Sequence, residues 1–388
     1  MNIAICHESV VPARGGCEVY IADLARRLVA DRHEVHLYAY ERDPAALPPA
    51  VVFHALMAKA GPRFLRPWRF AAACERAVTR EGHDVVLGFV KTWCQDVVLP
   101  LGGLHVASAE HNLRKYRSPW LRALARLAKW LDPCCWSYRL LERKQFAGRY
   151  RPVIVAPSRL VADHFERYYG LGPERVRVIH NAIDPQRFVE RDRLKLRAEL
   201  RERLGVGPDE TAALFVGNNY RLKGLDPLLR AVAQMPPLPF RLLVCGSPKT
   251  ARYQRLARRL GIARRIHFLG YQADVRACFF AADFLVHPTF YDPCSLVVLE
   301  ALACGLPAIT TRANGAAELL HPPHDGFVLD DPHDHRTLAR QMEQLCDPAR
   351  RAECAQAARR SAAAWTFDDH YQALLATLRE VALRKQAA

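Results

Sequence analysis

Short apolar runs alternate with amphipathic stretches along almost the whole chain. Residues 2–6 (NIAIC) have the composition of a buried strand, and residues 18–32 (EVYIADLARRLVADR) have the spacing of a helix with one apolar face. The next strands are expected at 34–40, 84–90 and 152–158, with helical stretches between them. Strands that alternate with helices predict a parallel sheet covered by helices on both faces.

The same pattern starts again after residues 170–190. A strand at the start of 176–188 leads into a turn-rich segment, and the later strands are expected at 212–218, 240–246, 265–270, 283–289 and 307–311. The chain of 388 residues therefore contains two consecutive α/β units. Ligands of such sheets bind beyond the carboxyl ends of the strands, so the residues that follow each strand are the candidates for chemistry.

Composition and charge narrow the range of functions. The chain has 56 Lys and Arg against 40 Asp and Glu, a net charge of +16, which predicts an anionic partner: nucleic acid, an anionic membrane or a phosphorylated substrate. Its 12 cysteines show no CxxC or Cys/His ligand spacing, so a zinc site has little support. No apolar run approaches the roughly 18 residues that span a bilayer. The N-terminus lacks a signal-peptide pattern, which predicts a cytoplasmic protein with reduced thiols.

One carboxylate stands in an apolar helix. Glu300 lies within LVVLEALA, where its helical neighbours are Leu296, Val297, Ala303 and Cys304. Burying an ionised carboxylate without partners costs several kcal/mol. Glu300 therefore either pairs with an internal arginine or backbone amide, or binds a ligand that supplies hydrogen-bond donors.

Residues 288–305 (PTFYDPCSLVVLEALACG) resemble the signature of the retaining nucleotide-sugar glycosyltransferases of family four, the glycosyl transferases group 1. That signature is a carboxylate, seven residues and then a glutamate in an apolar helix, here Asp292 and Glu300. Further segments match the family in order and spacing along nearly the whole chain: GGCE at 15–18, HNAID at 180–184, GNNYRLKG at 217–224, LGYQADVRACFFAAD at 269–283 and NGAAEL at 314–319.

The resemblance implies a donor site in the C-terminal half. Glu300 is expected to accept hydrogen bonds from the ribose hydroxyls of the nucleotide sugar. Asp292 stands where most relatives have a glutamate that contacts the transferred sugar, and it is one methylene shorter. The diphosphate and sugar hydroxyls are expected to bind backbone N–H groups at a helix N-terminus, those of Cys294, Ser295, Leu296 and Val297.

Two cations and two glycines are assigned to the donor phosphates in the same way. Arg221 and Lys223 follow an expected strand and would stabilise the negative charge on the leaving diphosphate, in place of a metal ion. Gly15 and Gly16 allow close backbone approach, and the resemblance places their loop over the diphosphate and the transferred sugar. Solvated loop cations and an ordinary turn are the alternatives.

The remaining assignments also rest on the resemblance. The strand-like stretch DVVLPL is followed by GGLH, which makes His105 the candidate for contacting the donor sugar, with His111 as the competing choice. Tyr271 and Gln272 are expected to hold the base, and Glu318 to lie near the donor.

The positive charge gathers in the N-terminal half. Residues 114–151 contain eleven Lys or Arg and only two acidic residues, and tryptophans are interleaved with them. Within this segment, WLRALARLAKWL has apolar residues at helical spacing and basic residues on the other face, which is typical of a helix at a membrane interface. A helix packed by its apolar stripe onto its own domain is the alternative. No nucleic-acid-binding motif is present.

Together these observations predict an α/β protein of the GT-B fold, two Rossmann-like domains facing a central cleft. We expect an acceptor-binding domain at 1–170, a nucleotide-sugar-binding domain at 171–365 and a helix at 366–388 that crosses back to the first domain. The predicted reaction is retaining, metal-independent and cofactor-independent transfer of a hexose to an acceptor hydroxyl.

Within the family, the resemblance is to glucosyltransferases of the lipopolysaccharide core. UDP-glucose is therefore the first donor and GDP-mannose the second, with a lipid-linked or phosphorylated saccharide acceptor at the inner face of an anionic membrane. Two further classes remain open: a nucleotide-sugar epimerase of the same fold, and a non-catalytic protein that binds a sugar nucleotide or a membrane.

Overall fold

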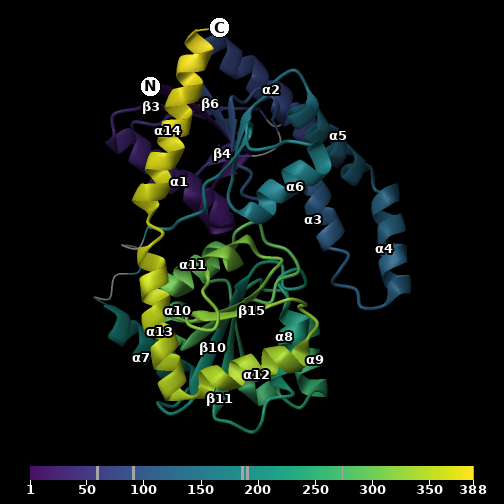
Figure 1. Cartoon of the computed structure of the whole chain (residues 1–388), viewed down its shortest axis with the longest axis vertical. Coiled ribbons are helices and arrows are strands. Elements are labelled where there is room, and N and C mark those ends of the chain that lie inside the picture. The colour runs from purple at the N-terminus through teal and green to yellow at the C-terminus, as the bar shows by residue number, and fades with distance from the viewer. Residues whose placement is uncertain (58–60, 90–91, 185–187, 189–191, 273, 388) are drawn as a thin grey trace. The chain divides into compact units, whose positions relative to one another are not determined.

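The computed structural model describes residues 1–57, 61–89, 92–184, 188, 192–272 and 274–387. It divides into two compact units, residues 1–181 with 368–388, and residues 182–367 (Figure 1). The expected division at residues 170 and 171 falls too early, because the strand at 176–178 pairs with the first sheet. Residue 90 of one expected strand and residues 185–187 of another segment lie outside the described residues.

The first unit is built on a parallel sheet with the strand order β5-β3-β1-β6-β7-β8-β9. Its strands are β1 (Asn2–Cys6), β3 (Glu34–Ala39), β5 (Val52–Ala55), β6 (Val85–Gly88), β7 (Val97–Val98), β8 (Val153–Ala156) and β9 (Val176–Val178). A separate pair consists of β2 (Ser9–Val10) and β4 (Glu41–Arg42). The sheet reverses its direction of growth between β1 and β6, so the loops after these strands diverge and leave room for a ligand.

Helices cover this sheet. They are α1 (Gly16–Ala30), α2 (Arg66–Glu81), which follows the 3-10 helix η3 (Arg63–Leu65), α3 (His105–His111), α4 (Pro119–Leu131), α5 (Pro133–Ala147) and α6 (Arg159–Tyr169). Most of them bury an apolar face, whereas α4 has no buried residue and lies at the margin of the unit, away from the sheet (Figure 1).

The last helix, α14 (Phe367–Gln386), belongs to the first unit from Asp368 onward. His370 donates a hydrogen bond to the His180 carbonyl (2.7 Å), Glu380 pairs with Arg177 (2.7 Å), and Lys385 pairs with Asp96 (2.8 Å). The structure therefore returns the C-terminal helix to the N-terminal unit.

The second unit contains a six-stranded parallel sheet with the order β12-β11-β10-β13-β14-β15. Its strands are β10 (Thr211–Gly217), β11 (Phe240–Gly246), β12 (Ile266–Gly270), β13 (Phe284–Val286), β14 (Ala308–Thr311) and β15 (Gly326–Leu329). The growth of this sheet reverses between β10 and β13. The loops after those two strands are thus the expected place for a site.

Helices also flank the second sheet. They are α7 (Arg193–Leu204), α8 (Leu225–Val232), α9 (Ala251–Arg259), α10 (Arg276–Ala281), α11 (Leu296–Ala303), α12 (His335–Cys346) and α13 (Pro348–Ala363), together with the 3-10 helix η7 (Gly315–Leu319). None of the helices in the described part of the chain is long and apolar enough to cross a bilayer.

Candidate functional site

The two loops at the reversal point of the second sheet meet through an ion pair. Lys223 follows β10, Asp292 follows β13, and the Lys223 ammonium donates a hydrogen bond to the Asp292 carboxylate. Both side chains are largely shielded from water, with 22% and 11% of their surface exposed. A cation and an anion are therefore held together where an α/β sheet binds its ligands.

The loop that carries Lys223 is fixed to the segment that carries Asp292. The Leu222 carbonyl accepts hydrogen bonds from the Phe290 amide (2.9 Å) and the Thr289 hydroxyl (3.2 Å). Gly224 has a φ of 84°, and a Cβ there would lie 2.0 Å from the Pro288 carbonyl oxygen. Only glycine permits this close approach, so the ion pair sits on a preformed support.

A buried histidine completes the arrangement around Asp292. His287 is 1% exposed, and its Nε2 lies 3.5 Å from Asp292 Oδ2. Burial alone would raise the pKa of Asp292, but the Lys223 ammonium and His287 outweigh burial and hold that pKa well below its ordinary value. Burial in turn lowers the pKa of His287. At neutral pH the site therefore contains a carboxylate, an ammonium and a neutral imidazole.

The start of α11 differs in part from the sequence prediction. The Ser295 amide already donates to Asn314 Oδ1 (3.1 Å), so it is not available to a ligand, and the Cys294 side chain is buried in the core. Leu296 and Val297 are the first two residues of α11, whose amides have no acceptor one turn earlier in the helix. Of the four proposed amides, that of Ser295 is thus occupied within the protein, and those of Leu296 and Val297 lie at the open end of the helix.

Glu300 lies in the middle of α11 and is 9% exposed. Its neighbours Leu299 and Ala301 belong to the apolar core of the second unit. Glu300 is therefore a largely buried carboxylate on a helix whose other residues are apolar.

The other predicted residues of this unit lie on adjoining loops. Arg221 is half-buried, two residues before Lys223. Tyr271 is exposed directly after β12, and the Gln272 side chain donates to the Leu269 carbonyl (2.7 Å). Glu318 is exposed on η7. Since all these loops leave the carboxyl edge of the same parallel sheet, they share the side of the unit that holds the ion pair.

Asn314 ties two of these loops together, although sequence reasoning gave it no role. Its side-chain oxygen accepts hydrogen bonds from the amides of Ser295 and Ala316, each at 3.1 Å, so it joins the start of α11 to the start of η7. His287 was missed as well. The available signal for His287 was its position, a polar residue directly after a buried strand.

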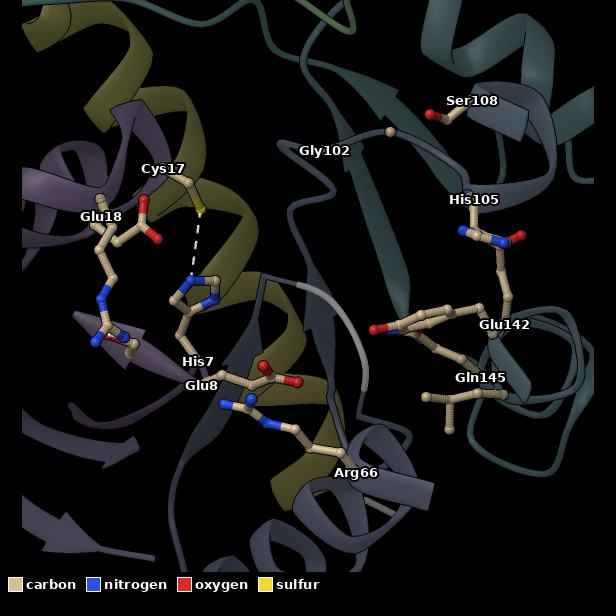
Figure 2. A pocket seen from close by; sticks show the side chains of 15 residues that line it. His7, Glu8, Cys17, Glu18, Arg66, Gly102, His105, Ser108, Glu142 and Gln145 are labelled. Carbon is tan, nitrogen blue, oxygen red and sulfur yellow. Dashed lines mark hydrogen bonds between the residues drawn. The ribbon is translucent and has the colours of Figure 1, made fainter. Parts of the chain in front are cut away.

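The first unit has its own cavity of about 510 Å³ at the carboxyl edge of its sheet. Figure 2 shows the polar side chains that line it, from the loop after β1, from α1 and α2, and from α3 and α5. The labelled residues include His7, Glu8, Cys17, His105 and Glu142. Such a volume lies in the range of about 300–1,000 Å³ that is usual for small-ligand sites.

His105 lines this cavity as the first residue of α3. The Glu142 carboxylate accepts hydrogen bonds from the amides of His105 (2.5 Å) and Val106 (3.2 Å) and thereby fixes the start of that helix. Burial raises the pKa of Glu142, and the two amides oppose the rise. Of the two candidate histidines, His105 lines the cavity and His111 does not. The His111 ring packs instead against that of His164, with 5.4 Å between the ring centroids.

The two glycines lie beside the cavity. Its lining includes Arg14, Cys17 and Glu18 but neither Gly15 nor Gly16, and Gly15 has an extended φ of 168°. The Cys17 thiol faces His7 Nε2 at 3.9 Å (Figure 2). Within the described residues, no group of three or more His, Cys, Asp or Glu side chains has the geometry to hold a metal ion.

Both halves of this chain match known protein families. Residues 14–187 match the family described as Glycosyltransferase Family 4, and residues 197–361 match Glycosyl transferases group 1. The lipopolysaccharide glucosyltransferase WaaG of Escherichia coli K12 is 29% identical over 205 residues, which cover 52% of this chain and only 54% of that protein. A D-inositol 3-phosphate glycosyltransferase of Salinispora tropica is 29% identical over 95% of this chain and 82% of that protein.

Solved structures show the same architecture. A crystal structure of WaaG superposes with a TM-score of 0.81 at 23% identity and covers 98% of this chain and 99% of that one. HepE of Anabaena, crystallised with UDP-glucose, gives a TM-score of 0.74 at 19% identity over 98% and 100% of the two chains. This chain therefore has the GT-B fold and consists, in order, of a Glycosyltransferase Family 4 domain and a Glycosyl transferases group 1 domain.

Proposed function

We propose that this glycosyltransferase moves glucose from UDP-glucose to a hydroxyl of a lipid-linked or lipopolysaccharide-core acceptor, with retention at the anomeric carbon. The observation that carries the proposal is the Lys223–Asp292 pair at the reversal point of the second sheet, beside the start of α11. The relatives support the choice of sugar, because WaaG is named a lipopolysaccharide glucosyltransferase and HepE was crystallised with UDP-glucose.

The donor occupies the carboxyl edge of the second sheet. Glu300 accepts hydrogen bonds from the ribose hydroxyls. The diphosphate binds Lys223, Arg221 and the amides of Leu296 and Val297, where a helix N-terminus favours negative charge. The base rests against Tyr271 and Gln272, and Glu318 lies close to the donor.

Lys223 contributes most when the sugar–phosphate bond breaks. Negative charge then grows on the leaving diphosphate, and a cation already held in place stabilises it without reorganisation. Asp292 positions Lys223 and contacts the transferred sugar. The leaving phosphate deprotonates the acceptor hydroxyl on the same face of the sugar, so neither a protein base nor a metal ion is required.

The acceptor binds the first unit. The cavity there is lined by Glu8, Arg66 and His105, which suit the hydroxyl and phosphate groups of a phosphorylated saccharide. Helix α4 exposes Trp120 and Leu124 beside several cations, which favours docking on an anionic inner membrane face from the cytoplasmic side.

A panel of nucleotide sugars tests this proposal. Purified protein should be stabilised against thermal unfolding by UDP-glucose, hydrolyse it slowly without acceptor, and retain that activity in EDTA. Transfer to a core saccharide should give an α-linked glucose by NMR. A preference for GDP-mannose would show that the proposed donor is wrong. An epimerised product formed without acceptor would show that the proposed reaction is wrong.

A further inference from the structure

The first unit contains a second cavity, an open groove of about 490 Å³. It is lined by Phe64 and Leu65 of η3, Trp68 of α2, Leu131 of α4, and Trp136 and Leu140 of α5, together with one proline and one serine. We call it the aromatic groove. Its residues belong to the described part of the chain and are separate from the polar cavity that contains His105.

The polar atoms at the base of the aromatic groove already have partners. The Trp68 Nε1–H donates to the Ser137 hydroxyl (3.1 Å), and that hydroxyl donates to the Phe64 carbonyl. The Lys144 ammonium lies over the Trp68 ring, 5.6 Å from its centroid. A ligand would therefore meet apolar surface and rings, which suits a hydrocarbon chain better than a polar molecule.

The groove is continuous with the apolar face of α4. Leu131, the last residue of α4, lines it, and the Trp136 Nε1–H donates to the Trp130 carbonyl (2.5 Å). Trp130 and Trp136 also meet edge to face, with their ring centroids 6.4 Å apart. Leu124 and Leu127 on α4 are 61% and 52% exposed, so the apolar surface extends from the groove along the helix.

The surrounding charge identifies the kind of partner. Residues 114–151, which include α4 and α5, hold eleven Lys or Arg and two acidic residues. An apolar face bordered by cations matches an anionic amphiphile. A second copy of this chain fits poorly, because a two-fold dimer would bring this face against itself and place like charges together.

We propose that the aromatic groove holds an acyl chain of an anionic phospholipid from the membrane on which α4 lies. This inference rests on the docking proposed above and adds a defined lipid site to it. Segments 64–68 and 136–142 form walls of both cavities, since Leu65 and Leu140 face the groove whereas Arg66 and Leu141 face the polar cavity. A lipid in the groove would thus fix the membrane surface close to the acceptor pocket.

Quenching by brominated lipids tests the groove directly. Vesicles of phosphatidylglycerol with bromine on the acyl chains should quench Trp68, which a bilayer touching only α4 would not reach. The fluorescence intensity that the brominated lipid removes should therefore fall in Trp68→Phe, and it should be unchanged in Trp365→Phe, a control in the second unit. An equal loss of intensity in Trp68→Phe and the wild type would overturn the proposal.

A second variant tests the groove in case Trp68→Phe does not fold. Leu140 is 56% exposed, so Leu140→Gln should fold normally, and it should weaken vesicle binding about tenfold. Leu383→Gln on α14 (67% exposed) should leave vesicle binding unchanged. Equal affinity in the two variants, or a lipid-free dimer that hides Trp136 from acrylamide, would reject the lipid site. Slow UDP-glucose hydrolysis by the wild type, measured in parallel, shows whether the proposed function survives such a result.

Discussion

Asp292 depends on its neighbours for its charged state. The carboxylate stays ionised in a buried position because the ammonium and His287 lie beside it. Lys223 in turn has an anchor that holds its flexible side chain in place. Under the proposed function, the donor phosphate would share this cation with Asp292.

Replacing Lys223 tests this arrangement. We expect Lys223→Ala to lower kcat by about 100- to 1,000-fold, the usual effect of removing one group that stabilises developing negative charge. Steady-state kinetics with UDP-glucose would measure it, and Lys195→Ala, a 75% exposed lysine of α7, is the matched control.

Loss of stability must be separated from loss of catalysis. Lys223→Ala leaves a buried carboxylate without its cation, which costs about 3–5 kcal/mol of folding free energy. The double variant Lys223→Ala/Asp292→Ala should recover much of the melting temperature and none of the activity. Recovery of activity, or a kcat of Lys223→Ala equal to that of the wild type, would contradict the role of Lys223.

Glu300 provides the second residue-scale prediction. Hydrogen bonds to a charged group contribute about 1.5–3 kcal/mol, roughly twice those to a neutral one, so Glu300→Gln should weaken UDP binding about tenfold. Isothermal titration would measure the change, with Glu199→Gln on the surface of α7 as the control. The two proteins should bind the 2′,3′-dideoxy analogue of UDP equally. A tenfold difference that persists with this analogue would rule out the ribose as the partner.

Among the elements, α4 is the helix whose sequence pattern and structure agree most closely. Its apolar residues fall on one face, and no residue of the helix is buried in the unit. The alternative that the apolar stripe packs onto its own domain therefore does not hold. A helix with an uncovered apolar face is a site for a partner or a membrane.

Binding to vesicles tests whether helix α4 docks on a membrane. Leu127→Gln should reduce the affinity for anionic vesicles about tenfold, because it removes one leucine from the apolar stripe. Leu194→Gln, at a more exposed position on α7, should not change it. Co-sedimentation at low and high salt would show both results, with weaker binding at high salt. Equal binding to neutral and anionic vesicles would argue against the charge-based docking.

For the whole molecule, α14 links the chain back to its first unit through buried imidazoles. His370 donates from Nδ1 to the His180 carbonyl, so the Nε2 of the neutral ring accepts from the Tyr20 hydroxyl (2.5 Å), and protonation of the ring would remove this acceptor. His83 lies beneath the end of the same helix, where Lys385 donates to its carbonyl (3.1 Å). The attachment of α14 is thus sensitive to protons.

Acidification should loosen this attachment. Burial lowers the pKa of His83 and of His370 from 6.5 to about 4. Between these values the unfolded chain binds more protons than the folded one, so stability is lost as the pH falls through this window. Hydrogen exchange in α14, corrected for intrinsic rates, should show falling protection from pH 7 to pH 4.

Histidine variants test whether these two side chains cause the pH dependence of hydrogen exchange in α14. His83→Gln/His370→Gln should flatten the pH dependence, whereas His324→Gln, an exposed histidine of the second unit, should leave it unchanged. A double variant with the slope of the wild type would show that other groups control the attachment of α14.

The sequence alone determined the class of fold and the family. Buried parallel strands need apolar side chains on both faces, so the strands β1, β10 and β11 stand out as continuous apolar runs. Four strands were not predicted: the two-residue strands β2 and β4, and the strands β5 and β15. β5 is only partly buried and β15 is short, so neither gives a strong local pattern. The carboxylate of Glu300 was also visible from sequence, since a charge in an apolar helix is a local anomaly.

Only the tertiary structure decided which side chains meet. Lys223 joins Asp292, Asn314 accepts from the Ser295 amide, and Glu142 fixes His105 across 37 positions of the chain. Nothing local in the sequence encodes such contacts, because they arise when the sheet order brings separate loops to one edge. The same holds for the aromatic groove, whose walls come from helices far apart in sequence. The local pattern of the sequence thus identifies candidate residues, whereas the topology of the sheets determines which of their side chains are in contact.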